Sequence, residues 1–336
     1  MGWDELQQWC LDLGESKYRG QQLYEWMYRY GVSSFEKMSN INKSFRNYLE
    51  TNCILNTIIL QKLSKSKLDQ STKMLFSTLD GNLIETVSMI NGNRHTVCIS
   101  SQAGCALDCD FCDTGKIGLK RNLSIGEIVD QLIFIRDYEK KVPITNVVFM
   151  GMGEPFHNYA NVIASADIFH SPRGFNLASS RITISTVGIL PKIQQFILEK
   201  QKYKLAISLN AVDDITRNQI MPINKKWKIA DIVKAGKDYS KMKNREVMFE
   251  YVLLKGINDS EDNAYKLSKL LKGIPCKINL IPYNEGVSFY LRPSNNSISK
   301  FSEILYNNRD TYRVLVRWSK GQDINAGCGQ LAAEKI

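Results

Sequence analysis

The sequence has no long hydrophobic run. No stretch of its 336 residues approaches the roughly 18 consecutive apolar residues that a transmembrane helix needs. The opening segment MGWDELQQWCLDLGE mixes acidic and apolar residues, so it does not have the pattern of a secretory signal peptide. Leu6 stands where an N-myristoylation motif carries a small or hydroxyl residue. Low-complexity tracts and fixed-period repeats are also missing. These absences predict a cytoplasmic protein that is not attached to a membrane.

The composition is that of an ordinary soluble protein. Apolar residues make up 43% of the chain and charged residues 23%, which is enough to bury a sizeable core. The length allows one large domain and one small domain. The net charge is +10, from 44 basic and 34 acidic residues. This excess favours a polyanionic partner such as nucleic acid, although a generally basic surface explains the charge equally well.

The first quarter of the chain has a helical pattern. In segment 17–32 apolar residues recur at spacings of three and four, and Gly31 follows as a C-cap. Residues 62–72 are polar and predict a connection. We therefore expect a mostly helical N-terminal domain at 1–75, which would contact RNA if the partner is nucleic acid, and a connecting segment at 76–90.

Beyond this point, strand and helix patterns alternate. We expect strands at 95–101, 145–150, 181–186, 204–210, 245–254, 276–283 and 311–319 and helices at 124–140, 189–200 and from Asp259. Strands separated by helices imply a parallel sheet. About six such units predict an α/β fold, a partial (β/α)6 barrel at 91–320, with a C-terminal extension at 321–336. In such barrels the functional residues lie at the C-terminal ends of the strands.

Three of the eight cysteines are clustered. Cys105, Cys109 and Cys112 have the spacing C-x3-C-x2-C and follow the first barrel strand. Three thiolates can bind three irons of a cubane cluster, which leaves the fourth iron open for chemistry. A zinc site is the alternative, but it would need a fourth nearby ligand, and His95 is ten residues upstream of Cys105. The remaining cysteines without a motif predict packing positions: Cys10, Cys53 and Cys276.

Several polar or flexible residues stand at predicted strand ends. In GMGEP (151–155), glycines permit close approach of a ligand and Glu154 can accept a hydrogen bond from an ammonium group. Ser185 ends the next strand, and residues 208–210 end the one after. Each position alone is also consistent with an ordinary turn. Together they predict one binding site at the mouth of the barrel.

Two further cysteines allow two interpretations each. Cys98 lies in a predicted strand, where a buried packing role is common for cysteine. Cys328 stands between two glycines near the end of the sequence, either as an incidental thiol or with clearance for a cofactor.

A longer series of motifs resembles the RlmN/Cfr family of radical S-adenosylmethionine (SAM) enzymes, which methylate adenosine in ribosomal and transfer RNA. The matching segments are YRGQQLYEWMY, CISSQAGCALDCDFCDTGKIGLKRNLSIGEI, FMGMGEPFHNY, RITISTVGILP, LAISLNA, MPIN, LLKGIND, INLIPYN and DINAGCGQLA. The resemblance covers nearly the whole chain and implies a radical SAM barrel. One departure is Gly327, where the family more often has alanine.

The resemblance implies a cofactor set and its ligands. A [4Fe-4S] cluster is expected on Cys105, Cys109 and Cys112, with SAM at its open iron. The positions expected to line SAM are Gly153, Glu154, Ser185, Ser208, Leu209, Asn210 and Asn284, with Asn279 as the alternative to Asn284.

The resemblance also implies a mechanism with two SAM molecules per turnover. Cys328 takes a methyl group from the first SAM. A 5′-deoxyadenosyl radical from the second SAM abstracts hydrogen from this methyl group, and the resulting radical adds to adenine. Cys98 then assists proton loss and forms a disulfide with Cys328 as the product leaves. Glu85 matches the position of a proton acceptor, although an exposed strand residue would look the same.

The expected substrates are 23S rRNA and tRNA, methylated at adenine C2, with an electron donor such as flavodoxin and a monomeric enzyme. A Cfr-type enzyme, which targets C8, is the nearest alternative, and the GEP motif followed by Asn158 and Tyr159 favours C2. A non-catalytic metal-bound RNA-binding protein and a radical SAM enzyme acting on protein or small molecules are more distant alternatives. The candidate phosphate contacts are Lys116, Lys120, Arg121, Lys225, Lys226 and Lys228.

Overall fold

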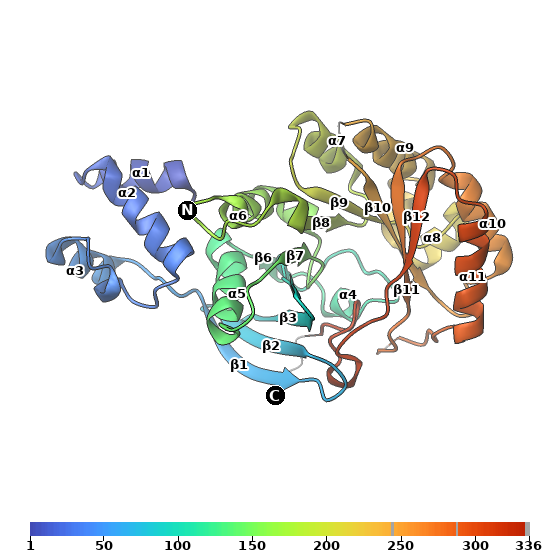
Figure 1. Cartoon of the computed structure of the whole chain (residues 1–336), viewed down its shortest axis with the longest axis horizontal. Helices are drawn as coiled ribbons and strands as arrows, with labels where there is room; N and C mark the ends of the chain where they lie inside the picture. The colour runs from blue at the N-terminus through green and yellow to red at the C-terminus, as the bar shows by residue number, and fades with distance from the viewer. Residues whose placement is uncertain (243–244, 287, 333–336) are drawn as a thin grey trace.

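A small helical lobe begins the chain in the computed structural model, which describes residues 1–242, 245–286 and 288–332. Its helices are α1 (Trp3–Asp12), α2 (Lys17–Tyr24) and α3 (Lys43–Asn52), and a π-helical turn (Glu25–Tyr30) continues α2. Gly31 ends this run with φ +65°, which confirms the predicted C-cap. A separate apolar cluster that includes Leu23, Phe45 and Leu49 holds the lobe together. Figure 1 shows the lobe beside the sheet rather than on it.

The helical prediction for 1–75 is wrong beyond the lobe. Residues Ile58–Lys65 form strand β1 and Ser71–Thr78 form β2, so the segment 62–72, predicted as a connection, contains the end of β1, the turn of the hairpin and the start of β2. Most side chains of β1 are exposed, which leaves little alternation of apolar and polar residues to read. The strand is formed by its antiparallel pairing with β2, a tertiary contact that local pattern does not reveal.

One large sheet forms the body of the protein. It has ten strands in the order β1-β2-β3-β4-β7-β8-β9-β10-β11-β12. The strands after the hairpin are β3 (Leu83–Asn91), β4 (Arg94–Cys98), β7 (Asn146–Phe149), β8 (Ile182–Thr186), β9 (Lys204–Ser208), β10 (Val247–Leu253), β11 (Cys276–Pro282) and β12 (Tyr312–Val316). Strands β1 to β4 pair antiparallel, and β4 and β7 to β12 pair parallel. The predicted α/β barrel is confirmed, with an antiparallel extension at one edge.

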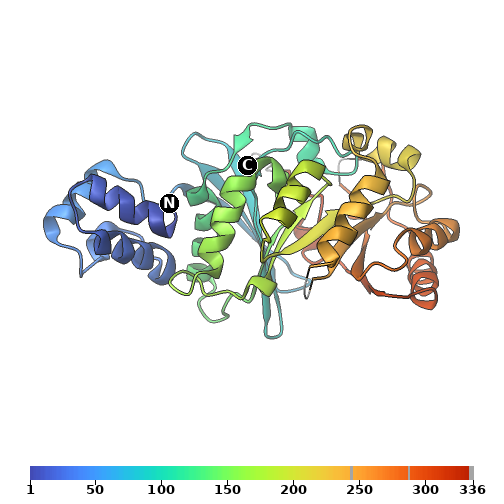
Figure 2. The same cartoon turned by 90° about the horizontal axis from the view of Figure 1, so that it is seen from above.

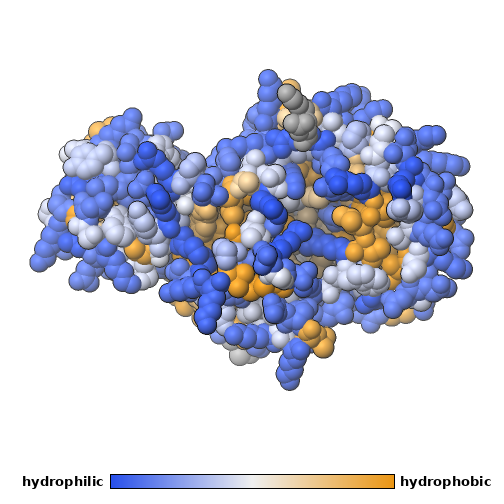
Figure 3. Space-filling view, viewed as in Figure 1, coloured by the Kyte–Doolittle hydropathy of each residue, from blue (hydrophilic) through white to orange (hydrophobic). Residues whose placement is uncertain are grey.

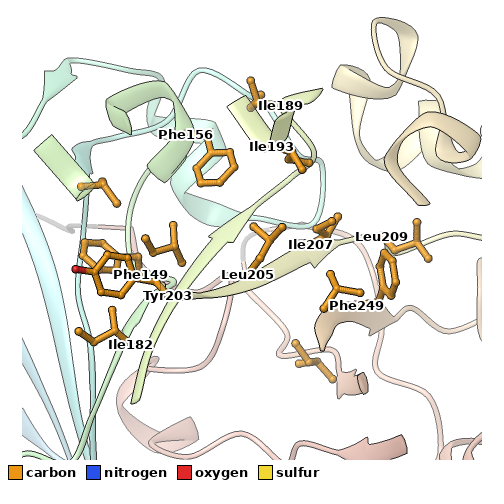
Figure 4. Close-up of a cluster of buried hydrophobic side chains, with 14 of the residues drawn as sticks. Phe149, Phe156, Ile182, Ile189, Ile193, Tyr203, Leu205, Ile207, Leu209 and Phe249 are labelled. Atoms are coloured by element: carbon orange, nitrogen blue, oxygen red, sulfur yellow. The ribbon is translucent and has the colours of Figure 1, made fainter. Parts of the chain in front are cut away.

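Helices connect the parallel strands and cover their outer face (Figure 2). They are α5 (Ile125–Tyr138), α6 (Tyr159–His170), α7 (Leu190–Leu198), α8 (Asp214–Ile220), α9 (Ile229–Ser240), α10 (Glu261–Leu270) and α11 (Asn295–Asn307). Ser124 and Glu127 form a capping box at the start of α5. Buried side chains of the sheet and helices form the main core (Figure 4). Within the described residues, no helix combines the length and the apolar character needed to cross a membrane.

The C-terminal segment, defined here as residues 321–332, returns from β12 to the hairpin of β1 and β2 (Figure 1). The Ser66 hydroxyl and the Lys67 backbone N–H donate hydrogen bonds to Asp323, both at 2.7 Å. The Gly321 N–H donates to Asp69 at 2.9 Å. The last part of the predicted extension, residues 333–336, lies outside the described residues. The segment therefore joins the two ends of the large sheet.

Candidate active site

The three clustered cysteines follow the first parallel strand. They lie between β5 (Gln102–Ala103) and the short helix α4 (Asp113–Ile117), and all are free thiols. Burial raises the pKa of Cys105 to about 12 and that of Cys109 well above its ordinary value. In both cases the charges of neighbouring cluster cysteines would raise the pKa further, so the three side chains are neighbours. Thiols in such surroundings are deprotonated by metal binding rather than by solvent.

Within the described residues, no three His, Cys, Asp or Glu side chains form a group that could hold a metal ion. A cubane is bound differently, because each thiolate ligates its own iron. The donor set of Cys105, Cys109 and Cys112 fits a cluster with one iron left for another ligand. The prediction that these residues hold [4Fe-4S] stays a prediction.

A first cavity lies directly beside these cysteines. Its volume is about 130 Å³, and its lining includes Cys109, Cys112, Gly153, Glu154, Ser185, Ser208, Asn210 and Cys328. The structure thus brings five of the seven residues predicted to line SAM to the cavity that also holds two cluster cysteines. We call it the cofactor cavity. The positions come from the C-terminal ends of β7, β8 and β9, the edge at which parallel strands present ligand-binding residues.

Glu154 is held in place by its own backbone surroundings. The N–H groups of Phe156 and Val187 donate to its carboxylate at 3.0 and 2.9 Å. Burial raises the pKa of Glu154 to about 7. Gly153 has φ +97°, and a Cβ there would stand 2.5 Å from Gln102, so packing alone already requires this glycine. The carboxylate retains lone pairs for a cationic ligand.

Leu209 does not reach the cofactor cavity. Its side chain is fully buried next to Phe249 in the core (Figure 4). Its carbonyl accepts a hydrogen bond from Arg217, whose guanidinium also donates to the carbonyls of Val187 and Ser208. Arg217 is fully buried, and its hydrogen bonds connect the segments of the chain that follow β8 and β9. The sequence analysis missed this residue.

The segment around Cys328 is tied to three parts of the molecule. The Lys73 ammonium of β2 donates to the Asn325 carbonyl at 3.3 Å. The Asp113 N–H at the start of α4 donates to the Gly329 carbonyl at 2.8 Å. The Gln330 amide donates to the Glu285 carbonyl after β11 at 2.7 Å. Cys328 is therefore not an incidental thiol on a loose chain end.

Asn284 contacts this segment and is absent from the lining of the cofactor cavity. Its amide donates to the Cys328 carbonyl at 3.1 Å, and its Oδ1 is buried with no hydrogen-bond partner among the described residues. A Cβ on Gly327 would stand 2.7 Å from the Asn284 side chain and 2.6 Å from Gln330. The glycine at 327 is thus matched to its neighbours.

A second and larger cavity occupies the inside of the barrel. It measures about 490 Å³ and adjoins the cofactor cavity, since both are lined by Met150, Glu250, Ile281, Cys328 and Leu331. We call it the lumen cavity. Its cationic lining residues are Arg94, Lys204, Lys277, Arg317 and Lys320. Burial and the charges of Lys277 and Arg94 lower the pKa of Lys204, so this wall is electrically positive. Figure 3 shows apolar surface on both sides of a hydrophilic strip across the larger body.

Cys98 lines the lumen cavity together with Cys328. Burial raises the pKa of Cys98 to about 12, and a thiolate at Cys328 would raise it further. Burial likewise raises the pKa of Cys328 to about 11, against the lowering effect of Arg317. Cys328 is exposed and lines both cavities. Asn279, the predicted alternative to Asn284, lines the lumen cavity and not the cofactor cavity.

Glu85 is buried on β3, and its carboxylate pairs with Lys73 at 2.9 Å. This excludes the simple exposed position considered from the sequence. Lys73 also contacts the Asn325 carbonyl, so Glu85 is linked to the C-terminal segment through one side chain. Glu85 lines neither cavity, and its catalytic role stays a prediction.

The remaining sequence predictions concern the cysteines without a motif and the candidate phosphate contacts. Cys10 and Cys276 are fully buried, and Cys53 packs beside the lobe core, which confirms packing roles. Among the candidate phosphate contacts, Lys116 pairs with Asp108 and Asp110, and Arg121 pairs with Asp80 and Glu127. Residues 225, 226 and 228 are exposed.

Comparisons with known proteins agree with this geometry. The family model of the ribosomal RNA large subunit methyltransferase N-terminal domain matches residues 1–55, and that of the radical SAM superfamily matches residues 99–267. The chain is 41% identical to a dual-specificity RNA methyltransferase RlmN of Desulfotalea psychrophila, over 99% of this chain and 93% of the relative. It is 42% identical to a probable dual-specificity RNA methyltransferase RlmN of Clostridium beijerinckii, over 99% and 94%.

A solved structure shows the same fold. The crystal structure of a radical SAM methyltransferase from Sphaerobacter thermophilus superposes with a TM-score of 0.95 at 39% identity, covering 99% of this chain and 98% of the other. The first family model also ends at residue 55, close to the end of the helical lobe. Family membership implies SAM and a [4Fe-4S] cluster as cofactors. The chain belongs to the RlmN family of radical SAM RNA methyltransferases.

Proposed function

We propose that this protein methylates C2 of adenosine in 23S rRNA and in tRNA, with Cys328 as the carrier of the methyl group. One observation carries the proposal: Cys328 lines both the cofactor cavity and the lumen cavity. A thiol at this junction can receive a group from one side and present it to the other. When bound, the cluster and SAM supply the methyl group and, after reduction, a 5′-deoxyadenosyl radical.

Cys328 has to be a thiolate to accept a methyl group. Its pKa of about 11 means that the free thiol is protonated at neutral pH, so a proton acceptor is required. The charge of Arg317 favours the thiolate. The ties from Lys73, Asn284 and Gln330 keep the sulfur between the two cavities.

Cys98 is the second proposed thiol. It lines the same cavity as Cys328, and a thiolate at Cys328 would raise the pKa of Cys98. We assign it the removal of the C2 proton and then an attack on Cys328 Sγ, which forms the disulfide, breaks the bond between Cys328 Sγ and the methylene carbon on adenine, and leaves that carbon to take up a proton as the new methyl group. Glu85 is the proposed proton acceptor, oriented by its ion pair with Lys73.

The lumen cavity is the proposed place of the target base. Its cationic wall suits the phosphates of RNA, and an extruded base needs such a pocket. We further propose that the helical lobe at 1–55 contacts the RNA and that a small electron donor such as flavodoxin reduces the cluster. We also propose that the enzyme is a monomer in the cytoplasm.

Nucleoside mass spectrometry of RNA from cells that lack this protein tests the reaction. We expect 2-methyladenosine to disappear from both 23S rRNA and tRNA and to return when the gene is restored. Loss of 8-methyladenosine instead would make the protein a C8 methyltransferase of the Cfr type. Loss from only one RNA class would restrict the substrate to that class.

A further inference from the structure

Glu250 is a buried carboxyl group that the proposed mechanism does not use. It lies in the middle of β10, is 4% exposed, and lines both cavities together with Cys328. It is the one carboxylate among the described residues that line the lumen cavity. Its position opposite Asn279 in the neighbouring strand β11 is fixed by the register of the sheet.

The two oxygens of Glu250 differ. Oε1 accepts a hydrogen bond from the Asn279 amide at 2.8 Å. Oε2 is buried and has no hydrogen-bond partner among the described residues. A buried polar atom without a partner costs free energy, so its retention beside a cavity points to a ligand that completes it.

Adenine offers a matching pair of groups on one edge. N1 accepts a hydrogen bond, the exocyclic N6 amino group donates one, and C2 is bonded to N1. A carboxylic acid has one O–H donor and one carbonyl acceptor. We propose that Glu250 reads the target adenine as a neutral acid, with Oε2–H donating to N1 and Oε1 accepting from the N6 amino group. Because the Asn279 amide donates to Oε1, this oxygen is the one without the proton. Its second lone pair stays available for the N6 amino group.

The surroundings of Glu250 favour the neutral acid. Burial raises its pKa above the ordinary value, while Arg317 and the Asn279 hydrogen bond act in the opposite direction. An ionised carboxylate could only accept, which would suit guanine N1–H rather than adenine N1. The protonated form therefore also selects adenine over guanine.

This mode of binding would place C2 near the thiol. Glu250 and Cys328 line the same two cavities, and its charge, when ionised, raises the pKa of Cys328. An adenine held by N1 and N6 turns its C2 side toward the protein groups next to Glu250. C8 lies on the opposite side of the purine and would point away.

The inference rests on the proposed function and deepens it, because it names the residue that selects the base. The test uses reconstituted holoenzyme, SAM, a reductant and RNA purified from a strain that lacks the gene. Two quantities are measured: methylation of Cys328 by peptide mass spectrometry and formation of 2-methyladenosine in RNA.

We expect Glu250→Gln to keep both activities, because an amide also has one donor and one acceptor on this edge. Glu250→Leu should keep methylation of Cys328 but lose about 10- to 100-fold in RNA methylation, the value of one bidentate base contact. Glu261→Gln is the control, since it removes an exposed carboxylate that pairs with Lys300 away from both cavities. It should change neither quantity.

Three outcomes would overturn the assignment. Inactive Glu250→Gln with normal Cys328 methylation would exclude reading by a neutral acid, even if Glu250→Leu does not fold. Full RNA methylation by Glu250→Leu would exclude any base contact. Loss of Cys328 methylation in folded, iron-loaded variants would make Glu250 a SAM ligand. If the wild-type enzyme forms no 2-methyladenosine at all, the proposed function fails first, and the inference fails with it.

Discussion

The two cavities that meet at Cys328 are built in different ways. In the cofactor cavity most polar groups already have partners: Glu154 accepts from two backbone N–H groups, and Asn210 accepts from Val252. In the lumen cavity the wall is cationic, and Glu250, which lies where the two cavities meet, has an oxygen without a hydrogen-bond partner among the described residues. Glu154 and Asn210 are thus held in place before any ligand binds, whereas the cationic wall of the lumen cavity can gain partners when it is filled.

This difference matches the two kinds of ligand in the proposed reaction. A cofactor that returns in every cycle is served by a preorganised pocket. An RNA substrate brings phosphates and a base edge of its own, which can satisfy a charged and incomplete wall. Variants should therefore separate the methylation of Cys328, on the cofactor side, from the methylation of RNA, on the lumen side. The expected effects are given from the largest to the smallest.

Loss of Cys328 should affect both halves, because it lines both cavities. We expect Cys328→Ala to lower RNA methylation by at least ~1000-fold, as for removal of a catalytic nucleophile. Its free energy of unfolding should change by less than about 0.5 kcal/mol, since the thiol packs against no core. Nucleoside mass spectrometry and denaturant unfolding measure the two effects. Cys53→Ala is the control, and normal methylation by Cys328→Ala would contradict the carrier role.

Arg217→Met should damage the cofactor side selectively. The variant leaves the buried carbonyls of Leu209, Val187 and Ser208 without their donor, so we expect a loss of about 3 kcal/mol of stability. SAM binding should weaken at temperatures where the protein is still folded. Urea unfolding and equilibrium SAM binding test this. The half-exposed Arg173, changed to Met, should cost less than about 1 kcal/mol. An equal loss in both variants would remove the special role of Arg217.

The lumen side should respond to charge. In the double variant Lys204→Gln and Lys277→Gln, we expect RNA binding to weaken about tenfold. The plot of log K against log salt should become shallower, its negative slope decreasing in magnitude by about 1.5. Methylation of Cys328 should not change. Filter binding at several salt concentrations measures the slope. Lys272→Gln is the control outside the cavity, and an unchanged slope in the double variant would place the RNA elsewhere.

The smallest effect should come from Gly327→Ala. The added Cβ would displace the side chains of Asn284 and Gln330, at a cost of about 1 kcal/mol for overpacking. Thermal unfolding detects a shift of this size. If Gly327→Ala is as stable as the wild type, the two side chains move without penalty and the departure from the family is neutral.

Much of the site could be predicted because its residues stand in regular patterns. The cysteine spacing, the alternation of strands and helices, and the positions of Glu154 and Ser185 at strand ends all follow from local sequence. The hairpin of β1 and β2 could not be predicted, because β1 is mostly exposed and is formed by pairing. The linkage of Glu85 to the C-terminal segment depends on Lys73, a residue without any pattern.

Two missed residues carried a signal that was not used. Glu250 is a charged residue within the apolar strand pattern REVMFEYVLL, and such a residue in a buried parallel strand needs a partner or a function. Arg217 stands just before the MPIN motif, but its burial follows only from the way the loops after β8 and β9 meet. Leu209 was predicted to line the cavity and does not. Its neighbours in sequence, Ser208 and Asn210, line the cofactor cavity, whereas the Leu209 side chain points to the opposite face and is buried in the core.

The attachment of the C-terminal segment has a consequence for folding. Asp323 binds Ser66 and Lys67 across 257 and 256 positions of the chain. Closing so long a loop costs chain entropy, so the sheet between the two partners has to form before the segment can dock. We therefore expect Cys328 to reach its place between the two cavities late in folding, when the strands that line those cavities have already paired.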